Sequence, residues 1–426
     1  MPATILALLD YYLPGSKAGG PVRSVQHLVH QLGGDYRFRI VTRDRDAGDH
    51  GPYADLHPNT WHPVEGAETL YLPPEQTGFR ALRRILRGTP HDVLYLNSLF
   101  SPRLTIIPLL LRRLGRVPAR PVVLAPRGEL HPGALSTGSW YGLLPAGLAK
   151  RVPTPKYLKK RLYLAVARAV GLFRGVVWQA STDDERADVL RHLGARADVV
   201  VAPDLVAAPP AESGPAAPVK PKAPGELRVL FVSRIAPKKN LHVAAALLGT
   251  VQGQVDFDVY GPVDDRRYWE MCQVVLDALP PHVNARYHGA LPYDRVRAVL
   301  RAHHLLFLPT RGENFGHVVL EALIEGCPVL VSDQTPWRGL EAARAGWDLP
   351  LDDPEAFTRA LRRCMEMDAA EHEAWRAGAA AYGRGRAAGS GALERNRVLF
   401  RRALGVAEAP SPATPARPAA RADLTP

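Results

Sequence analysis

The amino-acid sequence predicts an α/β protein with two doubly wound domains, and three observations support this fold class. Short β-rich runs alternate with helical patterns along the first half of the chain. A proline-rich segment between Pro203 and Glu226 interrupts the alternation, which then begins again. Alternating strands and helices form parallel sheets that are covered on both faces, and 426 residues are enough for two such domains.

The first domain is expected to span residues 1–205. Its buried strands are expected at Thr4–Leu9, Arg37–Thr42, Val93–Asn97, Val122–Ala125 and Val176–Ala180. Its helices are expected at Val22–Leu32, Arg103–Leu114 and Asp184–Leu193. Seven prolines between Pro203 and Glu226 make the segment 206–226 an expected interdomain linker.

The second domain is expected to span residues 227–385. Its strands are expected at Leu227–Val232, Phe257–Tyr260, Ala285–His288, Leu305–Leu308 and Val329–Ser332. Its helices are expected at Leu241–Thr250, Arg266–Ala278, Tyr293–Ala302 and Gly316–Glu325. A helix over 386–405 could cross back to the first domain, and the Ala/Pro-rich tail, 406–426, is expected to be disordered.

The composition is that of a globular protein, with 46% apolar and 23% charged residues. The chain has three cysteines, an odd number without C-x-x-C spacing. This argues against a disulfide framework and favours a cytoplasmic protein. The N-terminus lacks the basic region of a signal peptide, and no run of about 18 apolar residues could span a membrane. We therefore expect a soluble protein or one attached peripherally to the inner face of the cell membrane.

The positive charge of the chain is concentrated in one segment. The net charge is +12, but residues 80–182 contain 18 Arg and Lys against two acids, a local charge of +16. One interpretation is an arginine-rich solvated surface. The other is an anionic partner, which could be a phospholipid surface, a lipid diphosphate or nucleic acid.

Two glutamates follow one of the expected strands at a suggestive spacing. The strand ends at Leu308, Glu313 lies in the next loop, a helix begins near Gly316, and Glu321 lies on its second turn. Unpaired backbone N–H groups at a helix start attract anions, and glycine lets a ligand approach the backbone closely. A carboxylate can accept hydrogen bonds from a sugar diol. The alternative is a loop cap at Glu313 and a surface charge at Glu321.

Two basic residues follow the first strand of the second domain. Arg234 and Lys239 are expected at the carboxyl edge of that strand, where two cations can neutralise a diphosphate. The alternative is a pair of solvated basic side chains. Cations are unfavourable beside a helix start, so their position favours an anionic ligand.

These motifs resemble those of glycosyltransferase family 4, whose members adopt the GT-B fold. The run E-N-F-G-x-x-x-x-E-A-L-x-x-G-x-P-V-L resembles the E-x7-E signature, and S-R-I-A-P-K-K resembles an S-R-L-x-x-x-K element, with Asn240 at the usual glycine. The resemblance covers about residues 4–400. It implies a retaining hexosyltransferase whose C-terminal domain binds a nucleotide-sugar donor and whose N-terminal domain binds the acceptor. It also implies that Asn314, Phe315 and Gly316 contact the donor together with Glu313 and Glu321.

The N-terminal domain carries two weaker elements of the family. Gly19 and Gly20 follow the first strand, where family members have a glycine-rich loop that approaches the donor phosphates. The segment A-P-R-G-E-L-H-P-G-A-L resembles P-H-G-M-L-x-P-x-A-L, and the family's histidine aligns with Arg127. Either Arg127 or the nearby His131 is a candidate for the anomeric centre.

We expect no metal cofactor, because Arg234, Lys239 and a helix start would stabilise the departing diphosphate and Asp264–Asp265 is followed by two arginines. The expected acceptor is a glycan linked to a polyprenyl diphosphate in exopolysaccharide, capsule or O-antigen assembly. In the segment Lys156–Arg174, the residues Leu158, Leu162, Val166, Ala169 and Phe173 fall on one helical face. This face could lie on an anionic membrane or be buried in the domain. Two other functions remain open: a GT-B nucleotide-sugar epimerase and, more distantly, a nucleic-acid-binding protein.

Overall fold

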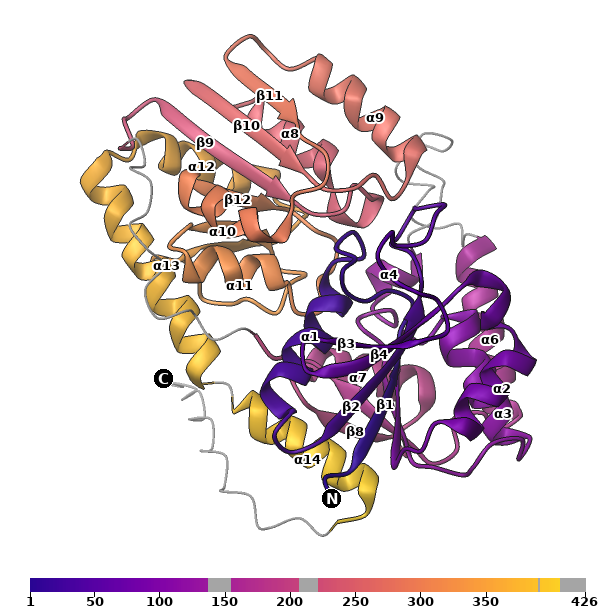
Figure 1. The fold of residues 1–426 in the computed structure, drawn as a ribbon. Helices are drawn as coiled ribbons and strands as arrows, with labels where there is room; N and C mark the ends of the chain where they lie inside the picture. Colours follow the sequence, from indigo (N-terminus) through magenta and orange to yellow (C-terminus); the bar gives the residue numbers. More distant parts are fainter. Residues whose placement is uncertain (137–154, 207–220, 390, 407–426) are drawn as a thin grey trace, which may run out of the picture.

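The computed structural model describes residues 1–136, 155–206, 221–389 and 391–406. They form two α/β domains, each with its own parallel sheet, and the C-terminal helices connect the two (Figure 1). The predicted fold class is confirmed. Most of the expected linker and tail lies outside the described residues.

The N-terminal domain contains an eight-stranded sheet with the order β3-β4-β2-β1-β5-β6-β7-β8. The strands are β1 (Thr4–Leu8), β2 (Arg37–Arg43), β3 (Trp61–Val64), β4 (Ala67–Leu72), β5 (Val93–Asn97), β6 (Val122–Ala125), β7 (Val176–Ala180) and β8 (Asp198–Val201). All neighbours are parallel except β3 and β4, which form an antiparallel hairpin at the edge. Glu65 and Gly66 turn this hairpin with positive φ angles of 42° and 87°, as two-residue hairpin turns require.

Helices cover both faces of this sheet (Figure 1). They are α1 (Gly20–Leu32), α2 (Phe79–Gly88), α3 (Ile107–Arg113), α4 (Pro132–Ser136), α6 (Pro155–Ala169) and α7 (Asp183–Leu193), together with short turns at Pro74–Thr77 and Pro102–Ile106. The sequence predicted β1, β2, β5, β6 and β7 within a residue at either end. It missed β3, β4, β8 and α2, and it extended the helix α3 backwards over the turn at 102–106.

The C-terminal domain contains a six-stranded parallel sheet with the order β11-β10-β9-β12-β13-β14. The strands are β9 (Glu226–Val232), β10 (Gln254–Tyr260), β11 (Val283–Tyr287), β12 (Leu305–Leu308), β13 (Val329–Ser332) and β14 (Gly346–Leu349). The helices are α8 (Leu241–Leu248), α9 (Arg266–Asp277), α10 (Tyr293–Ala302), α11 (His317–Ile324), α12 (Pro354–Glu366) and α13 (Ala369–Gly389), with a short turn at Pro237–Lys239. Strand order reverses between β9 and β12, so the loops after these two strands flank the switch point at which ligands bind in such folds.

The C-terminal helix α14 (Ala392–Leu404) returns to the N-terminal domain. Phe400 packs against the rings of Tyr36, Phe38 and Tyr95 in the core of that domain. The Asn396 side chain donates a hydrogen bond to the Pro203 carbonyl oxygen at 2.8 Å. The predicted boundary at 386 falls inside α13, which stays on the C-terminal domain until Gly389. The return to the first domain begins at Gly391, whose φ of 54° allows the chain to turn there.

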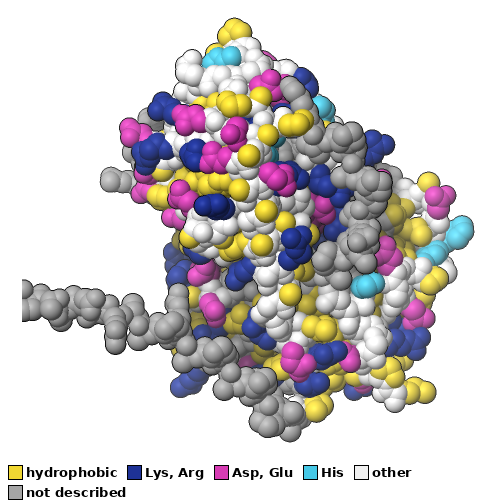
Figure 2. Space-filling model, turned by 90° about the vertical axis from the view of Figure 1, so that its left-hand side faces the viewer, with side chains coloured by type: hydrophobic (Ala, Val, Ile, Leu, Met, Phe, Trp, Pro, Cys, Tyr) yellow, Lys and Arg dark blue, Asp and Glu magenta, His cyan; other side chains and the backbone are white. Residues whose placement is uncertain are grey.

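Basic and acidic side chains are interspersed over the side of the molecule that carries α13 and α14 (Figure 2). The helices α2, α3 and α6 lie on the opposite side (Figure 1). No helix among the described residues is long and apolar enough to cross a membrane.

Candidate active site

Two adjoining cavities lie in the cleft between the domains. The first, which we call the basic chamber, has a volume of about 290 Å³. Its basic side chains are Lys17, Arg23, Arg127, Arg234, Lys238 and Lys239, and its acidic ones are Asp204, Glu313 and Glu321. With neutral histidines, the lining carries a net charge of +3. This charge suits an anionic ligand.

The structure brings the predicted donor-site residues together around the basic chamber. They are Gly19, Gly20, Arg127, Arg234, Lys239, Glu313, Asn314, Phe315, Gly316 and Glu321. The first three belong to the N-terminal domain and the others to the C-terminal domain. His131 lines the second cavity instead.

The glycine-rich loop is held open to the chamber by an aspartate from another loop. Asp46 accepts hydrogen bonds from the backbone N–H groups of Ser16 and Lys17 at 2.7 and 3.0 Å. Gly19 has a φ of 72° and precedes α1, and Gly19, Gly20 and Pro21 line the chamber at the start of that helix. Asp46 was not predicted, since it lies 30 residues from its partner and belongs to no motif.

The start of α11 forms the opposite wall of the chamber. Gly316 caps this helix with a φ of 79°. A Cβ atom at Gly316 would come within 3.0 Å of the Glu313 side chain and 3.2 Å of Trp337 Nε1, so only glycine fits there. Trp337 Nε1 donates a hydrogen bond to the Phe315 carbonyl oxygen at 2.9 Å and fixes the loop. The N–H groups at the start of α11 are thereby available to an anion.

Two lysines and a glutamate lie together at the base of this wall. Lys239 Nζ forms an ion pair with the Glu313 carboxylate. Burial would raise the pKa of Glu313, but Lys239, Lys238 and Arg234 outweigh it and hold this pKa at about 2. Burial lowers the pKa of Lys238 to about 8, with Glu313 acting in the opposite direction. The sequence analysis passed over Lys238, although its place next to Lys239 in the run P-K-K was a usable signal.

Arg234 lies at the mouth of the chamber. It forms an ion pair with Asp264 at 2.9 Å, and both side chains are about half exposed. Such a pair contributes little to stability, so Arg234 can exchange Asp264 for a ligand anion at small cost.

Glu321 lies on the second turn of α11 and lines the basic chamber. Among the described residues, its carboxylate makes no side-chain hydrogen bond or ion pair, and burial raises its pKa against the opposing influence of His317 and Arg23. Nearby, the Arg23 guanidinium lies 3.3 Å from the centre of the Tyr293 ring. Arg23 belongs to α1 and Tyr293 to α10, so this contact joins the two domains at the edge of the chamber.

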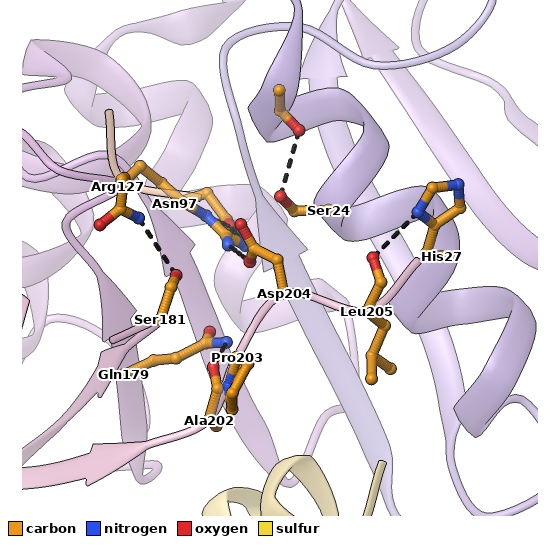
Figure 3. A network of polar contacts seen from close by, with 12 residues as sticks. Ser24, His27, Asn97, Arg127, Gln179, Ser181, Ala202, Pro203, Asp204 and Leu205 are labelled. Atoms are coloured by element: carbon orange, nitrogen blue, oxygen red, sulfur yellow. Dashed lines mark hydrogen bonds and ion pairs between the residues drawn. The ribbon is translucent and has the colours of Figure 1, made fainter. Parts of the chain in front are cut away.

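The Arg127 side chain is held by an ion pair and hydrogen bonds to other residues of the protein. It has a φ of 55°, forms an ion pair with Asp204 and donates a hydrogen bond to Asn97 Oδ1 at 2.7 Å (Figure 3). It also donates a hydrogen bond to the Tyr95 hydroxyl at 2.7 Å. Burial would raise the pKa of Asp204, but the Arg127 charge holds it well below its usual range. Arg127 also lines the basic chamber, and its place at the anomeric centre stays a prediction. Its side chain holds Asp204, which lies 3.7 Å from His317 Nε2 of the other domain.

His131 lies on the other side of the Glu313–Asn314 loop. A Cβ atom at Gly312 would come within 2.6 Å of His131 Nδ1, so the two domains approach each other closely at this point. The loop that carries His131 is fixed by Glu185, which accepts hydrogen bonds from the N–H groups of Gly128 and Ser181 at 2.6 and 2.7 Å. Burial lowers the pKa of His131, so the imidazole is neutral at pH 7.

The helix α6 presents an apolar stripe to solvent on the far side of the domain. Leu158, Leu162, Val166 and Val170 are spaced by four residues and are 54%, 66%, 52% and 46% exposed. The alternative in which this face is buried is wrong for these residues. Phe173, which was expected on the same face, instead packs edge to face against Trp178 with ring centres 5.2 Å apart.

Comparisons with known proteins agree with this architecture. Residues 215–382 match the family model of glycosyl transferases group 1. None of the curated proteins compared with this chain matches its sequence significantly.

Three solved structures are similar in fold over nearly their whole length. Sucrose-phosphate synthase from Thermosynechococcus elongatus is 17% identical, with a TM-score of 0.65 over 95% of this chain and 100% of that chain. Anabaena HepE in complex with UDP and glucose is 14% identical, with a TM-score of 0.63 over 94% and 100%. WaaG, a glycosyltransferase involved in lipopolysaccharide biosynthesis, is 16% identical, with a TM-score of 0.61 over 93% and 99%.

The fold is therefore GT-B, as predicted. The match to the group 1 model covers the C-terminal domain, which contributes most of the lining of the basic chamber. Together with the fold, this match supports a glycosyltransferase.

Proposed function

We propose that this protein is a retaining glycosyltransferase of family 4 that transfers a hexosyl group from a nucleotide sugar. The observation that carries the proposal is the order of groups in the basic chamber. Lys238, Lys239 and the start of α11 line the chamber together, and Glu321 lies one helical turn further on, with no side-chain partner for its carboxylate among the described residues. A nucleoside diphosphate has the matching order, with a dianionic phosphate group next to a ribose diol.

In this proposal the chamber stabilises the charge that develops as the glycosidic bond to the diphosphate breaks. Arg234, Lys238 and Lys239 neutralise the leaving group, and the N–H groups of α11 donate hydrogen bonds to it. Glu313 orients Lys239 through their ion pair. These cations do what a divalent metal does in other transferases, so we propose that the reaction needs no metal ion.

A thermal-shift screen against common nucleotide sugars tests the donor, because only a ligand that binds the native state raises the melting temperature. Release of free nucleoside diphosphate in the presence of acceptor then separates a transferase from an epimerase, which interconverts the donor without net release. No stabilisation by any nucleotide sugar would contradict the proposal.

We further propose that the acceptor is a lipid-linked glycan of surface-polysaccharide assembly, reached from the cytoplasmic side of the membrane. The support is the exposed stripe of α6, which is flanked by the exposed side chains of Lys159, Arg161 and Arg168. Apolar side chains beside cations are typical of helices that lie on an anionic interface. The described similarity to WaaG is consistent with such a pathway.

Liposome co-sedimentation tests the membrane surface. The double variant Lys159→Glu and Arg161→Glu should lose binding to anionic vesicles, since each cation near the leaflet contributes about 1 kcal/mol. The matched reversal of Arg266 and Arg267, exposed on α9 of the other domain, should retain binding. Equal pelleting of wild type with neutral and anionic vesicles, or no pelleting with either, would contradict the membrane surface.

A further inference from the structure

The second cavity of the cleft has a volume of about 300 Å³ and adjoins the basic chamber. Its walls come from one face of α7, from the loop that carries His131, and from the segment 333–338 after β13. Glu313 and Asn314 line both cavities. A group that reacts with a ligand of the basic chamber can therefore approach through this second cavity.

The wall formed by α7 is rigid and carries acidic side chains. Asp184, Asp188 and Arg191 are spaced by four and three residues, so they lie on one face of the helix. Thr182 caps the helix by accepting a hydrogen bond from the Glu185 N–H at 3.1 Å.

On the wall formed by the segment 333–338, the Arg338 guanidinium donates hydrogen bonds to backbone carbonyls of its own loop, including that of Asp333 at 2.6 Å. These contacts hold both walls in place without a ligand.

The two cavities carry opposite charge. The second one, which we call the acidic chamber, is lined by five carboxylates and two guanidinium groups, a net charge of −3 with His131 neutral. The carboxylates are those of Asp184, Glu185, Asp188, Glu313 and Asp333, and the guanidinium groups are those of Arg191 and Arg338. Because the basic chamber carries +3, a phosphate or carboxylate is attracted to one chamber and repelled by the other.

We propose that the acidic chamber is the acceptor subsite and that it takes an uncharged sugar ring. This inference rests on the proposed glycosyl transfer and specifies the substrate class of its second site. Carboxylates accept hydrogen bonds from sugar hydroxyls, and they repel uronic acids and sugar phosphates. A lipid diphosphate then lies outside the chamber, so at least one neutral sugar separates it from the accepting hydroxyl.

Asp184→Asn and Asp333→Asn test the assignment, and Asp183→Asn is the matched control. Asp183 and Asp184 are adjacent, exposed and both in the first turn of α7, but only Asp184 lines the chamber. The probes are methyl glucoside and methyl glucuronide, which differ by a carboxylate. Their binding is measured by saturation-transfer NMR in the presence of the nucleoside diphosphate from the donor screen. Slow hydrolysis of the nucleotide sugar without acceptor is the readout for the donor site.

Wild type should bind the glucoside and reject the glucuronide. Each chamber variant should weaken glucoside binding by about 10-fold, and the double variant should reduce the preference for the neutral sugar. Donor hydrolysis should not change in any variant, and Asp183→Asn should behave as wild type. The assignment is overturned if the glucuronide binds as well as the glucoside, if neither binds, or if the chamber variants bind as wild type while donor hydrolysis is intact. Absence of donor binding in wild type would instead contradict the proposed function.

Discussion

Replacing Glu321 by glutamine should raise the melting temperature of the ligand-free protein and lower its affinity for the nucleotide. The side chain lies in the basic chamber without a side-chain partner among the described residues, and burial raises its pKa. A raised pKa in the folded state means that the ionised form is less stable there than in the unfolded chain. At pH 7 the ligand-free Glu321→Gln variant should therefore melt at a higher temperature than wild type.

The same substitution should weaken nucleotide binding. A charged acceptor of a ligand hydrogen bond contributes about 1.5–3 kcal/mol, so affinity for the nucleoside diphosphate should fall by about 10- to 150-fold. Titration calorimetry measures this loss, and differential scanning calorimetry measures the stability. The stability difference should shrink as the pH falls through the raised pKa of the folded state and should be gone below about 4, where the carboxyl is protonated in the unfolded chain as well.

The control variant is Glu325→Gln, at the C-terminal end of the same helix α11. Glu325 is buried and forms ion pairs with Arg297 and Arg301 at 2.9 Å each, and it does not line the chamber. This variant should lower the melting temperature, because two cations lose their partner, and should keep the nucleotide affinity. Unchanged affinity in Glu321→Gln, or an equal loss in Glu325→Gln, would refute the ribose assignment.

Three further predictions concern the leaving group. Activity should persist in excess chelator, and complete loss that magnesium or manganese restores would contradict catalysis by protein cations alone. Arg234→Ala and Lys239→Ala should lower kcat more than they raise the donor KM, because they act where charge develops; a wild-type kcat in both would mean that the diphosphate binds elsewhere. Since the pKa of Lys238 is about 8, nucleotide affinity should fall as the pH rises through 8 and the ammonium group loses its charge. Lys238→Arg should remove this fall, and a flat wild-type profile between about pH 7 and 9.5 would count against a phosphate contact by Lys238.

In the N-terminal domain the sequence predicted five interior strands and missed the two edge strands β3 and β8, together with β4 and α2. The strand β8 is half-buried along its length, and β3 contains Pro63 at the sheet edge, where proline is tolerated because the ladder ends. The helix α2 buries only Leu82 and Leu86 and is otherwise rich in arginine. In each case the apolar pattern is too sparse to indicate the element.

Some residues of the candidate site could be identified from short sequence motifs, whereas others act on partners that are remote in the sequence. Glu313, Glu321, Arg234 and Lys239 lie in short motifs, so the sequence was sufficient to single them out. Asp204 acts on Arg127 from 77 residues away, and Asp46 and Glu185 likewise hold loops that are remote in sequence. Only the folded chain brings these carboxylates to the side-chain and backbone groups that they fix.

The location of the basic residues also bears on the interpretations of the positive charge that the sequence left open. Of the basic residues between 80 and 182 that the structure describes, Arg127 alone lines the basic or the acidic chamber, and Asp204 pairs with it. The other described cations of this segment therefore do not line either chamber of the cleft. Most of the exposed cations among its described residues lie instead on α2, α3 and α6. Arg113 on α3 donates a hydrogen bond to the Val170 carbonyl oxygen at the end of the α6 stripe. Because the apolar stripe adjoins this charge, an anionic membrane explains both features, whereas nucleic acid would explain only the charge.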